Sequence, residues 1–284
     1  MTDPFDFQAQ TARFAVIGNP VAHSRSPQIH QMFAQQFGIA LEYGRIQVDA
    51  GGFEQAVSHF TARGGAGLNV TLPFKLEARQ LCGRPGNTVS ARAQNAGAVN
   101  TLRFEEGAVF GDNTDGAGLV RDIEHNLGMQ IAGKRVLLLG AGGAARGVLQ
   151  PLSQCAPKNI TVANRTAQKA RALAKDFGGG IRGCGLGEVK GEVFDLVIHG
   201  SSAGLQGEAP DIDANCLRGA FAYDMLYAPA GETTAFTRWA LASGAARAGD
   251  GLGMLVEQAA ESFYLWHRRR PDTAPVLGAL RSES

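Results

Sequence analysis

The sequence has few cysteines, an almost even charge balance and no long hydrophobic run. Only four cysteines occur in 284 residues, and they form no Cys-x-x-Cys pair, so neither a disulfide framework nor a zinc site is expected. The six histidines show no metal-ligand spacing, and we expect no bound metal. Because 27 basic residues stand against 26 acidic ones, no overall charge favours nucleic acid or an anionic membrane as a partner.

Membrane and secreted proteins are also disfavoured. Apolar runs such as residues 136–139 are far too short to cross a bilayer, and the N-terminus lacks the basic start and apolar stretch of a signal peptide. We therefore expect a globular protein of the cytoplasm, a monomer or a homodimer. The basic run at residues 267–270 is expected to be the solvated end of a helix, where cations are favoured.

Short apolar runs alternate with amphipathic segments along most of the chain, which is typical of an α/β protein with mainly parallel sheets. We expect a first domain at 1–115, a doubly wound nucleotide-binding domain at 116–250, and a C-terminal helical segment at 251–284. Strands are expected at 14–17, 43–48, 66–70, 98–104, 108–110, 135–139, 159–163, 195–198 and 221–224. Helices are expected at 27–37 (with Ser26 as N-cap), 53–63, 116–127, 144–153, 167–177, 233–242 and 252–267. A hairpin turn is expected at 105–107 and a loop at 178–187.

The run RVLLLGAGGAARG at 135–147 predicts a nucleotide site. Gly140, Gly142 and Ala145 follow the G-x-G-x-x-A pattern, in which the glycines form a tight turn and admit a pyrophosphate. The following helix N-terminus offers amide donors and a positive dipole to phosphates. The pattern alone is weak, but the strand before it and the helix and strand after it favour cofactor binding over simple packing.

The end of the next strand indicates which dinucleotide is bound. An NAD site has Asp or Glu about 20 residues past the glycine pattern, whereas this chain has Asn164, Arg165 and Thr166, with Lys169 one turn later. An arginine with a hydroxyl and a lysine nearby suits a 2′-phosphate, so NADP is predicted. The alternative is that Arg165 and Lys169 are surface charges beside a Thr166 helix cap.

Hydride transfer also requires groups that bind the substrate and move a proton. Four polar stretches lie at the ends of expected strands or within them. GNPVAHSRSP (18–27) and NVTLPFK (69–75) follow strands, GAVNT (97–101) puts Asn100 in a short strand, and GDNTDG (111–116) forms the turn into the next helix. Each could be ordinary turn or helix-cap chemistry on its own. Because ligands bind beyond the carboxyl ends of strands in open α/β sheets, their joint position favours a single site.

Together with GAGGAARG (140–147), NRT (164–166), YDMLY (223–227) and DGLGMLVEQAA (250–260), these stretches resemble the shikimate dehydrogenases in order and spacing, over about residues 13–280. The resemblance implies two α/β domains with a cleft between them and a last helix that returns to the first domain. It further implies interconversion of shikimate and 3-dehydroshikimate with NADP(H), in aromatic amino-acid biosynthesis.

The resemblance also implies roles for single residues. Lys75 would be the catalytic base and acid, paired with Asp115. Ser24 and Ser26 would bind the substrate carboxylate, with Tyr227 near it. The ring hydroxyls would be held by Asn69, Thr71, Asn100, Asp115 and Gln258. The cofactor would be contacted by Gly140, Ala141, Gly142, Gly143, Ala144, Asn164, Arg165, Thr166, Lys169, Met225 and Gly251.

Several alternatives stay open at this point. Burial lowers the pKa of a lysine and a close carboxylate raises it, and a simple structural ion pair is a further possibility. The family usually has Asn-Ala-Thr/Ser where this chain has His199-Gly200-Ser201-Ser202, which changes one wall of the cofactor pocket. Rival functions are a quinate/shikimate or aminoshikimate dehydrogenase and a non-catalytic sensor of a related metabolite.

Overall fold

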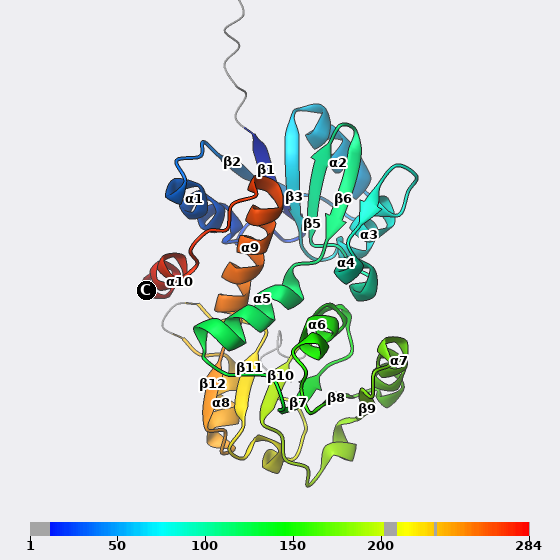
Figure 1. The fold of residues 1–284 in the computed structure, drawn as a ribbon, viewed down its shortest axis with the longest axis vertical. Coiled ribbons are helices and arrows are strands. Elements are labelled where there is room, and N and C mark those ends of the chain that lie inside the picture. The colour runs from blue at the N-terminus through cyan, green and yellow to red at the C-terminus, as the bar shows by residue number, and fades with distance from the viewer. Residues whose placement is uncertain (1–11, 202–208, 230–231, 284) are drawn as a thin grey trace, which may run out of the picture.

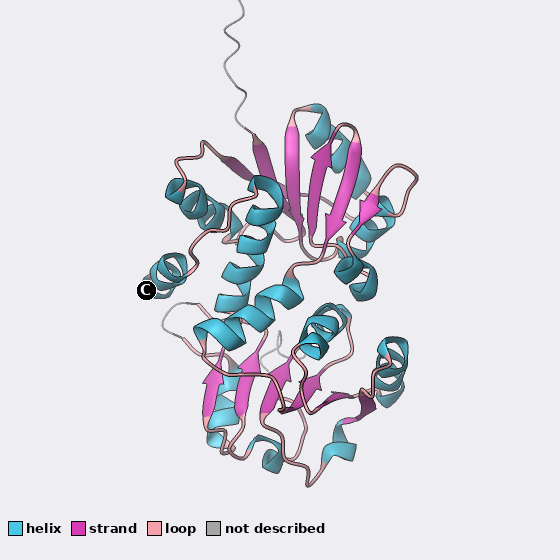
Figure 2. Ribbon diagram, in the orientation of Figure 1, coloured by secondary structure: helices cyan, strands magenta, loops and turns pink. Residues whose placement is uncertain are grey.

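The computed structural model describes residues 12–201, 209–229 and 232–283, which form two six-stranded sheets with helices along their faces (Figure 2). The first sheet has the order β2-β1-β3-β5-β6-β4, in which β5 is antiparallel to both of its neighbours, β3 and β6, and the other pairs are parallel. Its strands are β1 Arg13–Gly18, β2 Glu42–Gln47, β3 Gly65–Val70, β4 Thr88–Val89, β5 Thr101–Glu105 and β6 Ala108–Asp112. Its helices are α1 Ser26–Gln36, α2 Phe53–Ala62, α3 Lys75–Cys82 and α4 Ala91–Ala96.

The second sheet is parallel throughout, in the order β12-β11-β10-β7-β8-β9. Its strands are β7 Arg135–Leu139, β8 Asn159–Asn164, β9 Arg182–Gly185, β10 Leu196–His199, β11 Phe221–Asp224 and β12 Arg247–Gly249. Its helices are α6 Gly143–Gln154, α7 Ala167–Phe177 and α8 Ala235–Ala242, with 3₁₀ turns at Leu186–Val189 and Ala214–Leu217. This is the strand order of doubly wound dinucleotide-binding sheets, so the expected α/β class is confirmed.

Two helices lie between the sheets and connect the two halves of the chain (Figure 1). α5 spans Asp115–Arg121 and continues as a π-helical turn at Asp122–Asn126, and α9 spans Leu252–His267. α9 and the last helix, α10 at Ala274–Ser282, pack on α1 through a buried apolar cluster. The C-terminal helices therefore return to the first half, as expected. None of the described helices is long and apolar enough to span a bilayer.

The strongly periodic segments form the expected elements, but three expectations were wrong. Residues 178–187, expected as a loop, contain β9, because Gly183 lets the strand lie against α7 where a Cβ would meet Ala170 O at 2.3 Å. Ser26 is not the N-cap of α1, since Arg25 holds that position and Ser26 is the first helical residue. The segment 116–127 is not one α-helix, because its second half is the π-helical turn.

Short or weakly periodic elements were not expected at all. These are α3, α4, β4, β12 and α10. The hairpin turn at 105–107 is confirmed, and positive φ angles at Glu106 and Gly107 form its two-residue connection.

Candidate active site

Lys75 and Asp115 form an ion pair beyond the carboxyl ends of β3 and β6 in the first sheet. Each residue begins a helix, α3 and α5 respectively, and Lys75 Nζ lies 2.6 Å from Asp115 Oδ2. The lysine side chain is 27% exposed and the aspartate side chain 16%. The pair is thus shielded from bulk water but open enough for a small molecule to reach the ammonium.

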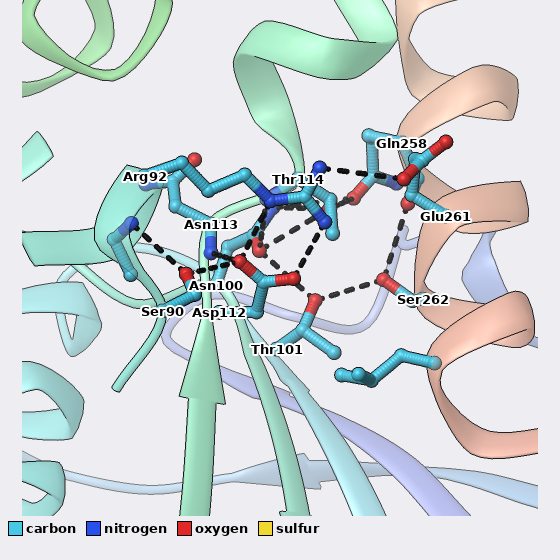
Figure 3. Close-up of polar contacts among 12 residues, drawn as sticks. Ser90, Arg92, Asn100, Thr101, Asp112, Asn113, Thr114, Gln258, Glu261 and Ser262 are labelled. Carbon is cyan, nitrogen blue, oxygen red and sulfur yellow. Dashed lines mark hydrogen bonds and ion pairs between the residues drawn. The ribbon is translucent and has the colours of Figure 1, made fainter. Parts of the chain in front are cut away.

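Asn100 orients the carboxylate of this pair. It is buried, its Nδ2 donates to Asp115 Oδ1 at 2.8 Å and Thr114 Oγ1 at 2.9 Å, and its Oδ1 accepts from Thr114 N at 2.9 Å. Gln258 of α9 places its Oε1 3.4 Å from both Asn100 Nδ2 and Thr114 Oγ1 (Figure 3). Four expected site residues, Lys75, Asn100, Asp115 and Gln258, are therefore brought together from separate elements.

The loop that carries Asp115 is held by a neighbouring carboxylate. Asp112 accepts from Arg92 at 2.7 Å and 2.5 Å, from Ser90 Oγ at 2.5 Å and from Asn113 N at 2.8 Å (Figure 3). Asn113 Oδ1 in turn accepts from Asp115 N at 3.1 Å. Sequence reasoning noted Asp112 and Asn113 in the GDNTDG run but missed Arg92, which no local pattern distinguishes.

Asn69 lies in a buried network behind the pair. Its Oδ1 accepts from Tyr43 OH at 2.7 Å and His30 Nε2 at 3.1 Å, and its Nδ2 donates to Ser262 Oγ at 2.9 Å and Thr101 Oγ1 at 3.2 Å. These four bonds use the whole hydrogen-bonding capacity of the amide. A substrate hydroxyl that binds Asn69 must therefore replace one of them.

Tyr43 and His30 were also missed; His30 is buried and Tyr43 half-buried, and both lie beside expected site residues. Burial raises the pKa of the Tyr43 phenol, so it donates as a neutral hydroxyl. The His30 ring stacks on Tyr43 with centroids 4.5 Å apart. Burial lowers the pKa of His30 to about 3, so its ring is neutral near pH 7.

The buried His30 predicts a loss of stability in mild acid. In the unfolded chain this histidine binds a proton near its usual pKa of 6.5, but in the folded protein only near 3. Protonation therefore favours unfolding as the pH falls below 6.5, by up to about 1.4 kcal/mol per pH unit. Urea unfolding at a series of pH values between 7 and 5 measures this slope.

His30→Gln is expected to make that slope shallower, because glutamine does not titrate. His267 is half-buried and its burial also lowers its pKa, so part of the slope remains in the variant. The exposed His59 provides the matched control, and His59→Gln should keep the slope of the unmodified protein. Identical slopes in the unmodified protein and His30→Gln would contradict the assignment.

Ser24 and Ser26, which were expected to bind the substrate carboxylate, lie after the end of β1 and at the start of α1. Ser24 Oγ is 3.2 Å from Ser26 Oγ, and Ser26 is buried. A Cβ on Gly18 would lie 2.3 Å from Thr71 Cγ2, so the stretches at 18–27 and 69–75 are neighbours, and Thr71 is half-buried there. Tyr227, from the second half, is 38% exposed; burial raises its pKa and the nearby positive charge of Arg25 opposes that rise.

The glycine turn after β7 has the geometry of a phosphate cradle. Gly140 has φ +115°, and a Cβ there would lie 2.9 Å from Gly200 O. Gly142 and Gly143 have open space where side chains would stand. The first hydrogen bond within α6 runs from Arg146 N to Gly142 O, so the amides before it have no acceptor in the helix. The turn, with the exposed Ala144 and half-buried Ala141, fits a pyrophosphate.

Arg165 and Lys169 are exposed at the carboxyl end of β8 and the start of α7, and neither makes an ion pair within the described part of the chain. Thr166 is the N-cap residue of α7, as the alternative expected, although its side chain makes no capping hydrogen bond. Asn164 Nδ2 donates to Thr166 O at 3.0 Å. The free cationic groups and the hydroxyl fit a 2′-phosphate.

Met225 and Gly251 contact each other on the β10 side of the glycine turn, opposite the side of β8. Met225 N donates to His199 O at 2.9 Å, and a Cβ on Gly251 would lie 2.3 Å from Met225 O. His199 is buried and hydrogen-bonded through both ring nitrogens, whereas Ser202 lies outside the described residues. Within the described ranges, no group of His, Cys, Asp or Glu is arranged to hold a metal ion.

Comparison with known proteins gives a consistent result along the chain. Residues 16–102 match the shikimate dehydrogenase substrate-binding domain, residues 122–205 the shikimate/quinate 5-dehydrogenase model, and residues 251–281 the shikimate 5′-dehydrogenase C-terminal domain. The shikimate dehydrogenase (NADP(+)) of Cupriavidus necator is 52% identical over 294 aligned positions, which cover 99% of this chain and 97% of that protein.

Solved structures agree with the sequence matches. An Ael1 enzyme from Pseudomonas putida superposes with a TM-score of 0.89 at 45% identity, over 95% of this chain and 98% of its own. The shikimate 5-dehydrogenase of Thermus thermophilus, in complex with NADP(H) and shikimate, superposes with a TM-score of 0.83 at 34% identity, over 95% and 98%. With relatives this similar over nearly its whole length, the chain belongs to the shikimate dehydrogenase family.

Proposed function

We propose that this protein interconverts shikimate and 3-dehydroshikimate with NADP(H) as the hydride carrier, in the biosynthesis of aromatic amino acids. The observation that carries the proposal is the Lys75–Asp115 pair, 2.6 Å apart, in a family whose named relatives use NADP(+). In this assignment residues 1–115 bind the substrate, 116–250 bind NADP, and 251–284 complete the substrate half. We place the enzyme in the cytoplasm, as a monomer or homodimer without a nucleic-acid partner.

The substrate carboxylate would bind at Ser24 and Ser26. Their hydroxyls lie 3.2 Å apart at the N-terminus of the eleven-residue α1, where the helix dipole favours an anion. Tyr227 would approach the same group from the second half. The ring hydroxyls would bind Thr71, Asn100, Asp115 and Gln258, with Asn69 exchanging one of its present bonds.

Lys75 would transfer the proton. In oxidation its amine takes the proton from the ring hydroxyl while the carbon loses hydride, and in reduction its ammonium returns that proton to the ketone oxygen. Asp115, oriented by Asn100 at 2.8 Å, holds Nζ in position through both directions. NADP, when bound, supplies the hydride acceptor or donor.

The cofactor residues fit NADP. The pyrophosphate would bind in the open space at the glycine turn formed by Gly140 to Ala144 and accept hydrogen bonds from the free amides of that turn. The 2′-phosphate would be surrounded by Asn164, Arg165, Thr166 and Lys169. Met225 and Gly251 would line the nicotinamide pocket. Among the described residues no acidic side chain stands at the end of β8 to bind a free ribose 2′-hydroxyl, which favours NADP over NAD.

Arg165→Ala is expected to raise the KM for NADP roughly 10- to 100-fold, because hydrogen bonds to a charged group contribute about 1.5–3 kcal/mol. The KM for NAD, which has no 2′-phosphate, should change little. Initial rates with each cofactor at saturating shikimate give both values.

Arg171→Ala is the matched control, since Arg171 is exposed on α7, the helix that follows Arg165, but is paired with Glu188 at 2.8 Å. It should leave both KM values unchanged. Equal small changes for NADP and NAD in Arg165→Ala would show that the 2′-phosphate is not bound there.

A broader substrate range is the second candidate, because the family model matched by residues 122–205 covers shikimate/quinate dehydrogenases. Absorbance at 340 nm, measured with shikimate or quinate and with NADP or NAD, separates the two functions. Turnover of shikimate with NADP alone supports the proposal, turnover of both acids supports the broader range, and no turnover supports a metabolite sensor.

A further inference from the structure

A chain of three polar side chains ends at the mouth of the second sheet. His199 is the last residue of β10, and its ring has no exposed surface. Nδ1 lies 3.2 Å from Asp224 Oδ1, at the end of β11, and Nε2 lies 2.8 Å from Ser201 Oγ. The ring also stacks on Phe236, with centroids 4.7 Å apart. The imidazole is therefore fixed in its plane and bonded at both nitrogens.

The direction of these hydrogen bonds follows from the chemistry of the groups. The Asp224 carboxylate can only accept, and its Oδ1 already accepts from Leu226 N at 3.1 Å. Nδ1 must therefore carry a proton and donate it to Asp224. In the neutral ring Nε2 then has only a lone pair, so it accepts the proton of the Ser201 hydroxyl. The Ser201 oxygen keeps its own lone pairs for another donor.

The sheet order places Ser201 at one particular end of the expected cofactor site. β7 lies between β8, which Arg165 follows, and β10, which ends at His199. Ser201 N lies 3.1 Å from the position of a Cβ on Gly140, and a Cβ on Gly200 would lie 2.8 Å from Met225 Sδ. Ser201 thus stands on the Met225 side of the glycine turn, away from the residues that fit the 2′-phosphate.

We propose that His199 and Asp224 are positioning residues that hold Ser201 as a hydrogen-bond acceptor for the nicotinamide riboside half of NADP. Ser201 would accept a carboxamide N–H or a ribose O–H, since both are donors. His199 acts only through Ser201, because its own ring is enclosed. The inference rests on the proposed NADP site.

The test measures binding rather than turnover. Isothermal titration of the full chain is carried out with NADP(+) and with adenosine 2′,5′-bisphosphate, which has the 2′-phosphate but no nicotinamide. Ser201→Ala and His199→Ala should each weaken NADP(+) binding about 3- to 10-fold, the range for one hydrogen bond, and leave the bisphosphate unaffected. The double variant His199→Ala/Ser201→Ala should lose no more affinity for NADP(+) than either single variant. Ser201→Thr keeps the hydroxyl and should retain the affinity of the unmodified protein.

The 3-acetylpyridine analogue of NADP(+) identifies the donor, because it lacks the carboxamide N–H. A Ser201→Ala effect that disappears with this analogue assigns the carboxamide, and one that persists assigns the ribose. Unchanged NADP(+) binding in Ser201→Ala, or equal losses for NADP(+) and the bisphosphate, would overturn the inference. Since His199→Ala removes a buried ring, Ser201→Ala decides the question if that variant does not fold.

Arg165→Ala, titrated in parallel, separates this inference from the proposed site. If it weakens both ligands while Ser201→Ala weakens neither, only the role of His199 and Ser201 is wrong. If Arg165→Ala leaves both ligands unaffected, the NADP site itself is wrong and the inference falls with it.

Discussion

Lys75→Ala is expected to lower kcat for shikimate oxidation by roughly 10²- to 10⁴-fold, the contribution of a positioned general acid or base. The ring hydroxyl would lose its proton acceptor, whereas the serine hydroxyls and the amides of Asn100 and Gln258 would still bind substrate. The KM for shikimate should therefore change little. Steady-state rates at saturating NADP(+) give both constants.

Two controls define what the lysine does. Lys75→Arg keeps a positive charge that can pair with Asp115, but a guanidinium does not release its proton near neutral pH, so kcat should stay low. Lys158→Ala removes an exposed lysine at the far end of β7 and β8 and should leave kcat unchanged. A Lys75→Arg variant with nearly full kcat would show that the charge, rather than proton transfer, is required.

Gly253→Ala is expected to destabilise the protein by roughly 2–4 kcal/mol, from overpacking and the disturbance of a buried carboxylate. A Cβ at this position would lie 1.9 Å from Asp122 Oδ1. Asp122 cannot easily move, because it accepts from Tyr223 OH at 2.6 Å and Asn126 Nδ2 at 2.9 Å. Burial also raises the pKa of Asp122, so the ionised carboxylate depends on the hydrogen bonds from these two donors.

Differential scanning calorimetry should show a fall in Tm of roughly 5–12 °C for Gly253→Ala. The matched control is Gly278→Ala in α10, where a Cβ would meet nothing within 4 Å. That variant should be neutral or stabilised by up to about 1 kcal/mol, since alanine favours a helix more than glycine does. If Gly253→Ala were as stable as Gly278→Ala, then α9 and the π-helical turn that carries Asp122 could move apart at no cost in stability.

The sequence predicts the elements whose hydrophobic pattern is strong. β7 is fully apolar after Arg135 and was expected at its observed bounds, and the glycine turn after it follows a known pattern. β9 was missed because its packing depends on Gly183, whose close contact with α7 leaves no hydrophobic signal. α3 was missed because its helical pattern is short and mostly polar.

The candidate site was predictable where function requires a residue type in a recognisable run. Lys75 and Asp115 were expected to pair, and they do so across 40 positions of sequence. Arg92, Tyr43 and His30 act on site residues only through contacts between distant segments, such as the 3.1 Å bond from His30 to Asn69. Such contacts depend on the fold as a whole, so one sequence without its structure does not reveal them.

α5 crosses α9 with backbone against backbone, because Gly118 has no side chain; a Cβ there would lie 2.8 Å from both Gln258 N and Met254 O. Asp115 begins the first of these helices and Gln258 lies on the second, so neither can shift along the other. The groups that would receive the substrate ring are consequently preorganised. Little conformational entropy remains to be lost there on binding, and the affinity for substrate depends mainly on the contacts themselves.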